Sequence, residues 1–267
     1  MKMPGRVWLV GAGPGDPELL TLKAARLIGS AEVIVHDRLV SRQVLALANA
    51  EARLVPVGKQ PGWHPVPQSE INSILVREAS AGRLVVRLKG GDPFIFGRGS
   101  EEMIAVRAAG IRCDVVPGIS AAQGAASSLA LPLTHRGLAS SVRFITGHAR
   151  RDQALVLDWA GLADPETTLV VYMGAATISS IADRLIANGL PGEMPVLAIS
   201  DATLPREQRL ISRLSSVGQD VVSACFEGPV LFVIGRVVAL VAEGGAYPLL
   251  EAVRDAAPAW LPELADA

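Results

Sequence analysis

The segment Arg87–Glu102 reads RLKGGDPFIFGRGSEE and begins at the end of an apolar, β-branched run, Arg83–Lys89. A run of this kind that is closed by glycine predicts a buried β-strand. Glu101 and Glu102 then favour the first turn of a helix, where carboxylates are stabilised by the positive end of the helix dipole. Strand, glycine-rich loop and helix in this order predict one repeat of an α/β sheet, with the loop at the carboxyl edge.

The rest of the first half repeats this pattern. Short β-branched runs closed by Gly, Pro or a polar residue predict further strands at Arg6–Gly11, Glu32–Asp37, Arg53–Val57 and Ile111–Val116. Between them, apolar residues with helical spacing predict helices over Leu19–Ile28 and Ile71–Ala79, the second after a start signal at Pro67-Gln68-Ser69. Strands that alternate with helices predict a parallel sheet with helices on both faces.

The second half resumes the alternation. Its predicted strands are Val142–Thr146, Thr168–Met173, Pro195–Ile199, Gln208–Leu214 and Pro229–Gly235, and Thr177–Asn188 is predicted to be a helix that ends at Gly189. Gln208–Leu214 could be antiparallel, so a mixed sheet is expected. We expect an N-terminal α/β domain over residues 1–117, a C-terminal α/β domain over 118–244, and a tail over 245–267.

The composition narrows the class of protein. The chain has 267 residues, of which half are hydrophobic, and a formal net charge of -1. No global basic field would draw it to nucleic acid or to an anionic membrane, so an anionic partner has to be held by local cations. The longest apolar stretch, Pro229–Ala242, is interrupted by Arg236 and is too short to span a bilayer.

Cysteine and histidine usage points to a reducing compartment and to no metal site. Cys113 and Cys225 are the two cysteines, and we interpret both as buried structural thiols rather than as a disulfide framework. The four histidines lack the spacing of metal ligands. The apolar run near the N-terminus is cut by Gly13, Pro14 and Asp16 and does not form a signal peptide. A cytoplasmic protein is therefore expected.

The glycine-rich turn Gly11–Asp16 occupies the place of a dinucleotide-binding fingerprint, after the first strand and before the first helix. Its details disfavour a dinucleotide. The position that requires the third glycine holds Asp16, whose carboxylate is electrostatically wrong beside a pyrophosphate, and Pro14 removes a backbone N–H.

The loop after Lys89 is more informative. Gly90 and Gly91 permit close approach of the backbone to a ligand, and Asp92 could accept hydrogen bonds from ribose hydroxyls or an amino group. Phe94 and Phe96 offer apolar walls. Six basic residues lie at or just beyond predicted strand ends and could converge on a polyanion: Arg38, Lys59, Lys89, Arg98, Arg136 and Arg143.

Two segments resemble the signature segments of the tetrapyrrole methylases: GAGPGDPELLTLKA (Gly11–Ala24) and VRLKGGDPFIFGRGSEE (Val86–Glu102). The resemblance covers residues 6–240 and is strongest to those members that methylate uroporphyrinogen III. Shorter segments support it by their order: HDRLVS (His36–Ser41), VGK (Val57–Lys59), PQSEIN (Pro67–Asn72), VVPGISAA (Val115–Ala122), PLTHRG (Pro132–Gly137), TGH (Thr146–His148) and YMG (Tyr172–Gly174).

This resemblance implies two α/β domains with an active-site cleft between them, usually in a homodimer. It implies methyl transfer from S-adenosyl-L-methionine, which leaves S-adenosyl-L-homocysteine, with no metal. The implied reaction converts uroporphyrinogen III to precorrin-1 and then precorrin-2 by methylation at C2 and C7, and feeds siroheme, cobalamin or heme d1 synthesis. Because the chain starts at the methylase strand, the stand-alone form is expected.

Site residues follow from the resemblance by position. Asp37 and Lys59 match positions of proton transfer, and Arg98 matches one of substrate binding and catalysis, for which we favour anchoring because a guanidinium stays charged. Glu101 and Arg136 match positions that contact substrate. The implied cofactor pocket comprises Pro14, Gly90, Gly91, Asp92, Ile95, Ser120, Ala121, Met173 and Ala202. His36 replaces a common tyrosine, and Asp201-Ala202-Thr203 replaces a commoner Asn-Gly-Thr.

Three other functions stay open on the sequence. A related methylase could act on a later precorrin rather than on uroporphyrinogen III. A nicotinamide oxidoreductase is disfavoured by Pro14 and Asp16 but would bind its cofactor at the same edge of the sheet. A binding module would hold the same ligands without methyl transfer.

Overall fold

The computed structural model describes residues 5–58, 66–148 and 155–241. By its internal contacts the chain divides between Gly124 and Ala125 into two compact units, which we call the first and the second unit. Each unit contains one five-stranded sheet. The ten predicted strands are all found, with ends that differ by at most one residue.

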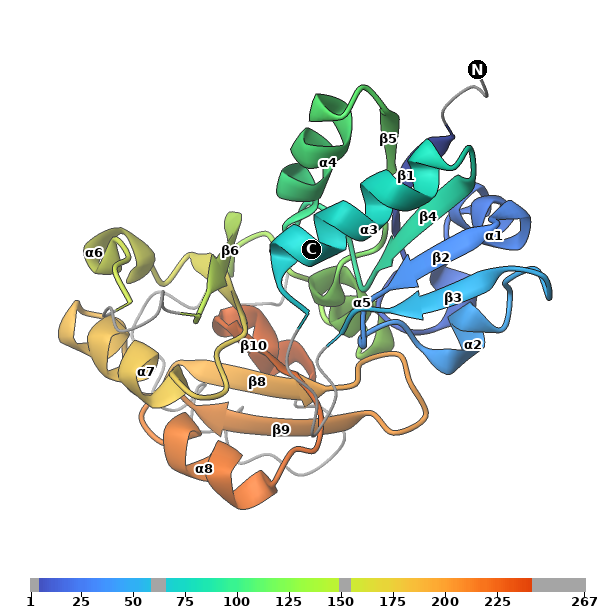
Figure 1. Cartoon of the computed structure of the whole chain (residues 1–267). Helices are drawn as coiled ribbons and strands as arrows, with labels where there is room; N and C mark the ends of the chain where they lie inside the picture. Colours follow the sequence, from blue (N-terminus) through green and yellow to red (C-terminus); the bar gives the residue numbers. More distant parts are fainter. Residues whose placement is uncertain (1–4, 59–65, 149–154, 242–267) are drawn as a thin grey trace. The chain divides into compact units, whose positions relative to one another are not determined.

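All strands of the first unit are parallel, in the order β3-β2-β4-β1-β5 (Figure 1). The prediction of a parallel sheet is therefore confirmed. The strands are β1 (Arg6–Gly11), β2 (Val33–His36), β3 (Arg53–Pro56), β4 (Leu84–Lys89) and β5 (Arg112–Val116). The helices are η1 (Pro17–Leu19), α1 (Leu22–Ser30), α2 (Arg42–Leu45), α3 (Gln68–Ser80) and α4 (Gly99–Ala108), and α5 (Ala121–Ser128) begins at the end of this unit.

Side chains of alternate strand residues enter two separate cores, because successive residues of a strand point to opposite faces. Val7, Val33 and Val85 pack with Ile74 and Leu75 of α3 on one face. On the opposite face, residues of the same strands pack with α1 and α2, among them Val10, Ile34, Val86, Ile28 and Val44. Helices thus cover both faces of the sheet, as the alternation of strands and helices predicted.

The order of the strands determines where a ligand would bind. β1 and β4 are neighbours, but β1 leads to α1 on one face of the sheet and β4 leads to α4 on the other. The loops that follow these two strands therefore diverge at the carboxyl edge. In open α/β sheets this switch point is where ligands bind.

A cluster of charged residues lies at the opposite, amino-terminal edge of the same sheet. The buried carboxylate of Glu78, near the end of α3, forms ion pairs with Arg53, Arg77 and Arg83. Burial acts to raise the pKa of Glu78, but the hydrogen bonds and charge of the arginines, that of Arg53 first, outweigh it and lower this pKa below its ordinary value.

The second unit contains a mixed sheet in the order β6-β7-β10-β8-β9. Its strands are β6 (Ser141–Thr146), β7 (Thr167–Tyr172), β8 (Pro195–Ser200), β9 (Gln208–Arg213) and β10 (Val230–Ile234). β6 and β7 are parallel, whereas β10 is antiparallel to both β7 and β8, and β9 is antiparallel to β8. The expected mixed sheet is confirmed, including the antiparallel β9.

Helices α6 (Trp159–Leu162), α7 (Ile178–Ala187) and α8 (Val217–Ala224) and the 3-10 helix η2 (Arg236–Val241) complete the second unit. Ile181 and Leu185 of α7 pack against Val171 and Phe232 in its core. None of the helices in the described part of the chain is long and apolar enough to cross a membrane.

Two sequence interpretations are wrong in this unit. Cys225 is exposed at the carboxyl end of α8 and is no buried thiol, whereas Cys113 on β5 is buried. Arg143 lies inside β6 and not at a strand end, and its guanidinium donates to the carbonyl oxygen of Gly161 at 2.5 Å.

Candidate active site

Three glycines meet at the carboxyl edge of the first sheet, where β1, β4 and β5 end. A Cβ atom added to Gly11 would lie 2.5 Å from the nitrogen of Gly118 and 2.6 Å from the carbonyl oxygen of Gly91. Gly91 has a φ of 66°, which favours glycine. Side chains are thus excluded from this edge, and the backbone of three loops is brought together.

Hydrogen bonds join these loops. Gly91 N donates to the carbonyl oxygen of Gly13 at 2.7 Å, and Gly13 N donates to that of Gly91 at 3.2 Å. The carboxylate of Asp92 accepts from Phe94 N at 2.8 Å and, 26 residues along the chain, from Gly118 N at 3.0 Å. Each carboxylate oxygen can accept a second hydrogen bond, so Asp92 keeps capacity for a ligand.

Seven of the predicted cofactor residues lie in the first unit. Pro14 follows Gly13, which is bonded to Gly91, and Ser120 and Ala121 lie 3.7 Å from where a Cβ atom on Gly91 would be. Gly90, Asp92 and Ile95 belong to the loop after β4. The fold therefore brings the ends of β1, β4 and β5, which carry these residues, to one edge.

Met173 and Ala202 lie in the second unit, each just after the end of a strand. β7 and β8 both run antiparallel to β10, so their carboxyl ends share one edge of the second sheet. Met173 has a φ of 55°, and the residues that flank Ala202, Asp201 and Thr203, have φ values of 50° and 71°. Non-glycine residues in this left-handed region are uncommon and cluster at functional sites.

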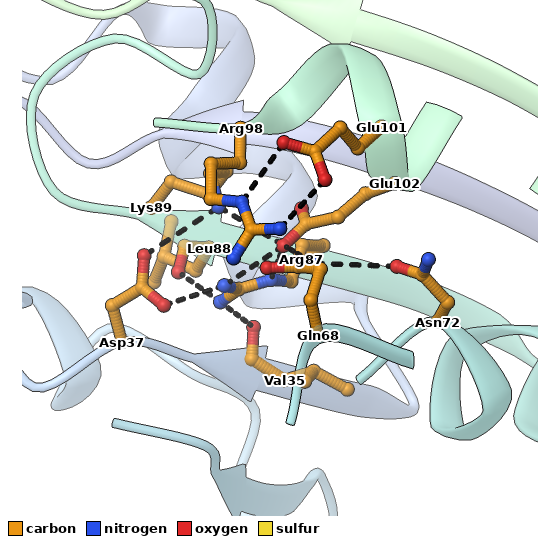
Figure 2. A network of polar contacts seen from close by, with 10 residues as sticks. All are labelled: Val35, Asp37, Gln68, Asn72, Arg87, Leu88, Lys89, Arg98, Glu101 and Glu102. Atoms are coloured by element: carbon orange, nitrogen blue, oxygen red, sulfur yellow. Dashed lines mark hydrogen bonds and ion pairs between the residues drawn. The ribbon is translucent and has the colours of Figure 1, made fainter. Parts of the chain in front are cut away.

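A network of charged residues, most of them buried, lies next to the carboxyl edge of the first sheet (Figure 2). The guanidinium of Arg87 binds Asp37, with Nη2 2.5 Å from Oδ1, and also Glu102, with Nε and Nη2 each 3.2 Å from Oε1. Lys89 Nζ lies 3.1 Å from the same Oε1 and 3.7 Å from Oδ2 of Asp37. Gln68 of α3 donates to Oε1 of Glu102 at 3.1 Å.

Burial within this network is uneven. The side chains of Arg87, Lys89 and Glu102 are at most 4% exposed, whereas that of Asp37 is 28% exposed. Desolvation and the neighbouring charge of Arg87 lower the pKa of Lys89, against the opposing effect of Asp37 and Glu102. Asp37, which was predicted to be catalytic, is thus the member that a ligand can reach.

Arg98 and Glu101 form an exposed pair at the start of α4, with Arg98 Nη2 2.7 Å from Glu101 Oε2. The hydrogen bond to Glu101 raises the pKa of Arg98. The same bond lowers the pKa of Glu101. Arg98 adopts a left-handed φ of 57° directly before the helix.

Arg136 lies in the second unit, where it lines a pocket with Thr134, His135 and Glu166. Lys59, the other predicted catalytic residue, lies outside the described residues. Of the six cations expected to face a polyanion, Lys89 is buried in ion pairs and Arg143 lies within a strand, so neither belongs to such a set. Arg38, Arg98 and Arg136 are exposed.

Arg87 and the role of Glu102 were not predicted from the sequence. Both residues lie in the segment Arg87–Glu102, but Glu102 was explained by the helix dipole alone. A signal was present, because Arg87 and Lys89 are two residues apart in a strand predicted to be buried. Two cations on one buried face require buried anions nearby.

No group of three or more His, Cys, Asp or Glu side chains within residues 5–58, 66–148 and 155–241 could hold a metal ion. The loops of the first unit instead offer backbone and carboxylate groups, which suit an organic ligand that carries amino and hydroxyl groups.

Comparison with known proteins identifies relatives of this arrangement. The profile of the Tetrapyrrole (Corrin/Porphyrin) Methylases matches residues 6–218. A uroporphyrinogen-III C-methyltransferase of Paracoccus denitrificans is 58% identical over 91% of this chain and 85% of its own length. An S-adenosyl-L-methionine-dependent uroporphyrinogen III methyltransferase of Arabidopsis thaliana is 51% identical, over 89% of this chain and 64% of its own.

A siroheme synthase of Gluconobacter oxydans is 48% identical over 89% of this chain, which spans 50% of that longer protein. Among solved structures, a uroporphyrin-III C-methyltransferase of Thermus thermophilus complexed with S-adenosyl homocysteine has a TM-score of 0.75 and 43% identity. That match covers 88% of this chain and all of the other.

Proposed function

The chain belongs to the tetrapyrrole methylases, and from this we propose that it transfers methyl groups from S-adenosyl-L-methionine to C2 and then C7 of uroporphyrinogen III. The product is precorrin-2, by way of precorrin-1, for siroheme, cobalamin or heme d1 synthesis. The observation that carries this proposal is the 58% identity, over 91% of the chain, to a relative named for that reaction.

The glycine-lined edge of the first unit fits the cofactor. The close packing of backbone at Gly11, Gly91 and Gly118 joins the ends of three loops, and Asp92 beside them can accept hydrogen bonds from an amino group or ribose hydroxyls. We assign Pro14, Gly90, Gly91, Asp92, Ile95, Ser120 and Ala121 to the cofactor, together with Met173 and Ala202 of the second unit. When bound, the sulfonium supplies an activated methyl group.

The chain's own task is then to hold the reactants and to manage charge. A methyl donor that is already activated needs positioning of the nucleophilic carbon in line with it, which can supply much of the reduction in barrier. The carboxylates of uroporphyrinogen III need cationic side chains to bind them, and we assign Arg98 and Arg136 to this role. Glu101 is assigned as a further substrate contact.

Attack by a pyrrole carbon builds positive charge on the ring system, which is relieved by loss of a proton. We assign the acceptance of this proton to Asp37, and the partial exposure of its carboxylate and its ion pair with Arg87 support this assignment. Lys59 would take part in the same transfer. A guanidinium stays charged, which supports anchoring and not general-base catalysis for Arg98.

Further proposals concern the setting of the enzyme. We propose two domains, residues 1–117 and 118–244, a homodimer, and a cytoplasmic location. What supports the last is the cysteine usage, because Cys113 and Cys225 are both free thiols.

The decisive experiment incubates the purified chain anaerobically with uroporphyrinogen III and S-adenosyl-L-methionine carrying a labelled methyl group. We expect a product with two labelled methyl groups and two equivalents of S-adenosyl-L-homocysteine. Precorrin-1 should accumulate early and then be consumed. Methylation of a later precorrin but not of uroporphyrinogen III would instead identify a related methylase, and binding of the cofactor without transfer would identify a binding module.

A further inference from the structure

The buried network of the first unit has one exposed end. Glu102 is fully buried and uses Oε1 to accept from Arg87, Lys89 and Gln68 (Figure 2). Its Oε2 is also buried and accepts no hydrogen bond from the described residues. The charges therefore run from Glu102 in the interior to Asp37 at the surface, with the two cations between the two carboxylates.

The strand β4 explains how this network forms. Val85, Arg87 and Lys89 point to the face that α3 and α4 cover, while Val86 and Leu88 point to the other core. The covered face thus changes from apolar to cationic toward the carboxyl edge of the sheet. α4 supplies Glu102 and α3 supplies Gln68 opposite these cations.

Stability alone does not account for the network. Burial of the charges of Arg87, Lys89 and Glu102 costs desolvation, and well-packed apolar residues of similar volume often serve a fold as well or better. The orientation of Asp37, in contrast, depends on it directly. Arg87 holds Oδ1 through Nη2, while its Nη1 is fixed by the carbonyl oxygens of Val35 and Leu88, at 3.4 and 3.2 Å.

The charged and titratable groups around Asp37 come from two elements and its own loop. β4 contributes Arg87 and Lys89, the start of α4 contributes Arg98, Glu101 and Glu102, and His36 and Arg38 flank Asp37 in the chain. α3 contributes the uncharged Gln68 and Asn72. Arg87 and Lys89 have ion-pair contacts to Asp37.

We propose that Arg87, backed by Lys89 and Glu102, is a positioning residue that fixes the orientation of the Asp37 carboxylate and supplies the cation beside it. This inference rests on the proposed function, in which Asp37 accepts the proton. Removal of a cation beside a carboxylate disfavours its ionised form, and removal of a neighbouring anion favours it. Arg87→Gln and Glu102→Gln should therefore act in opposite directions.

Two measurements test the role of Arg87, and the first of them does not depend on the proposed methyl transfer. The first is the pH titration of the Asp37 side-chain carbon in protein labelled with ¹³C-aspartate, with the signal assigned by Asp37→Asn. Its midpoint should move to higher pH in Arg87→Gln and to lower pH in Glu102→Gln. The second is the acidic limb of the pH–rate profile for methyl transfer, which should move in the same two directions, with kcat of Arg87→Gln lowered about 100-fold at neutral pH.

Glu78→Gln is the matched control, because it removes another buried carboxylate with arginine partners, at the opposite edge of the sheet. It should leave both the titration of Asp37 and the pH–rate profile in place. If Arg87→Gln does not fold, Arg87→Lys tests the same point. Lysine keeps the charge but cannot reproduce the planar fork, so kcat should fall while the titration stays near that of the wild type.

Unmoved titrations in Arg87→Gln and Glu102→Gln, or shifts of one sign in these two variants, would overturn the inference. Where Arg87→Gln does not fold, an unmoved titration in Glu102→Gln together with an unchanged kcat in Arg87→Lys would overturn it. A wild-type chain that methylates no tetrapyrrole would overturn the proposed function, while the titration would still decide whether the network governs Asp37.

Discussion

The carboxylate of Asp92 reaches across 26 residues of chain to the backbone of Gly118, with Oδ2 3.0 Å from the amide nitrogen. The same side chain caps its own loop through Phe94 N. Asp92 therefore fixes the loop after β4 against the loop that leads into α5. Any ligand bound at this edge depends on the resulting backbone shape, even where it does not touch the carboxylate.

Asp92→Ala should weaken the binding of S-adenosyl-L-homocysteine about 10-fold or more, because it removes two hydrogen bonds that hold the glycine edge and a direct acceptor. Asp92→Asn keeps one acceptor oxygen, so its affinity for S-adenosyl-L-homocysteine should lie between those of the wild type and Asp92→Ala. Isothermal titration calorimetry measures the affinities, and circular dichroism verifies the fold. Unchanged affinity in a folded Asp92→Ala protein would place the cofactor elsewhere.

Arg98→Ala should impair turnover or the KM for uroporphyrinogen III and leave the affinity for S-adenosyl-L-homocysteine largely intact. The guanidinium is exposed and pairs with Glu101, so its loss disturbs little of the fold. Steady-state kinetics and calorimetry on one preparation provide the comparison, and Arg107→Ala, at the other end of α4, serves as the control. An equal loss in the kinetics and in the affinity for S-adenosyl-L-homocysteine would contradict the assignment of Gly90–Ile95 to the cofactor and of Arg98 to the substrate.

Most of the fold could be predicted because its strands are β-branched runs closed by glycine, proline or a polar residue, as at Arg83–Lys89. Their directions were harder to read. β10 is antiparallel to β7 and β8, and a fully buried strand has the same apolar composition in either direction. The division between Gly124 and Ala125 likewise depends on packing and not on a local turn signal.

Those parts of the candidate site that depend on neighbouring residues in the chain could be predicted from the sequence. Those that depend on packing between distant segments could not. The glycines of the loop after β4 are visible in sequence as a close approach of backbone. The contact of Arg87 with Glu102 is not visible, because it forms only when α4 covers one face of the sheet. Lys89 looked like a ligand-binding cation for the same reason, since its anionic partners are supplied by other elements.

The two cysteines should differ sharply in reactivity. Burial raises the pKa of the Cys113 thiol to about 11, whereas Cys225 is exposed. At pH 8 we expect Ellman's reagent to modify one thiol per native chain rapidly and the second only in denaturant, and Cys225→Ser should abolish the rapid phase. Two thiols that react at one rate would contradict the burial of Cys113.

The same raised pKa has a consequence for stability at alkaline pH. The folded state holds the Cys113 proton more tightly than the unfolded chain, so this group's contribution is full below its ordinary pKa of 9.0 and is lost as the pH rises toward about 11. Urea unfolding should show a smaller loss of stability between pH 8.5 and pH 10.5 in Cys113→Ala than in the wild type, measured relative to each protein's own value at pH 8.5.

Glu78→Gln should destabilise the first unit, because three arginines would lose their shared anionic partner. We expect a loss of roughly 2 kcal/mol near pH 7, less than for a fully buried pair because the arginines are partly exposed to solvent. The pKa of Glu78 is lowered in the folded state, so its contribution is full above the ordinary value of 4.5 and is lost as the pH falls through the lowered one.

Urea unfolding of both proteins at pH 7 and at pH 4 or below measures this difference, which should shrink at the lower pH. Glu70→Gln on the same helix is the control, since Glu70 is exposed in the first turn of α3 and should contribute far less. A difference between Glu78→Gln and the wild type that stays constant with pH would show that the stabilisation comes from packing of the side chain and not from its charge.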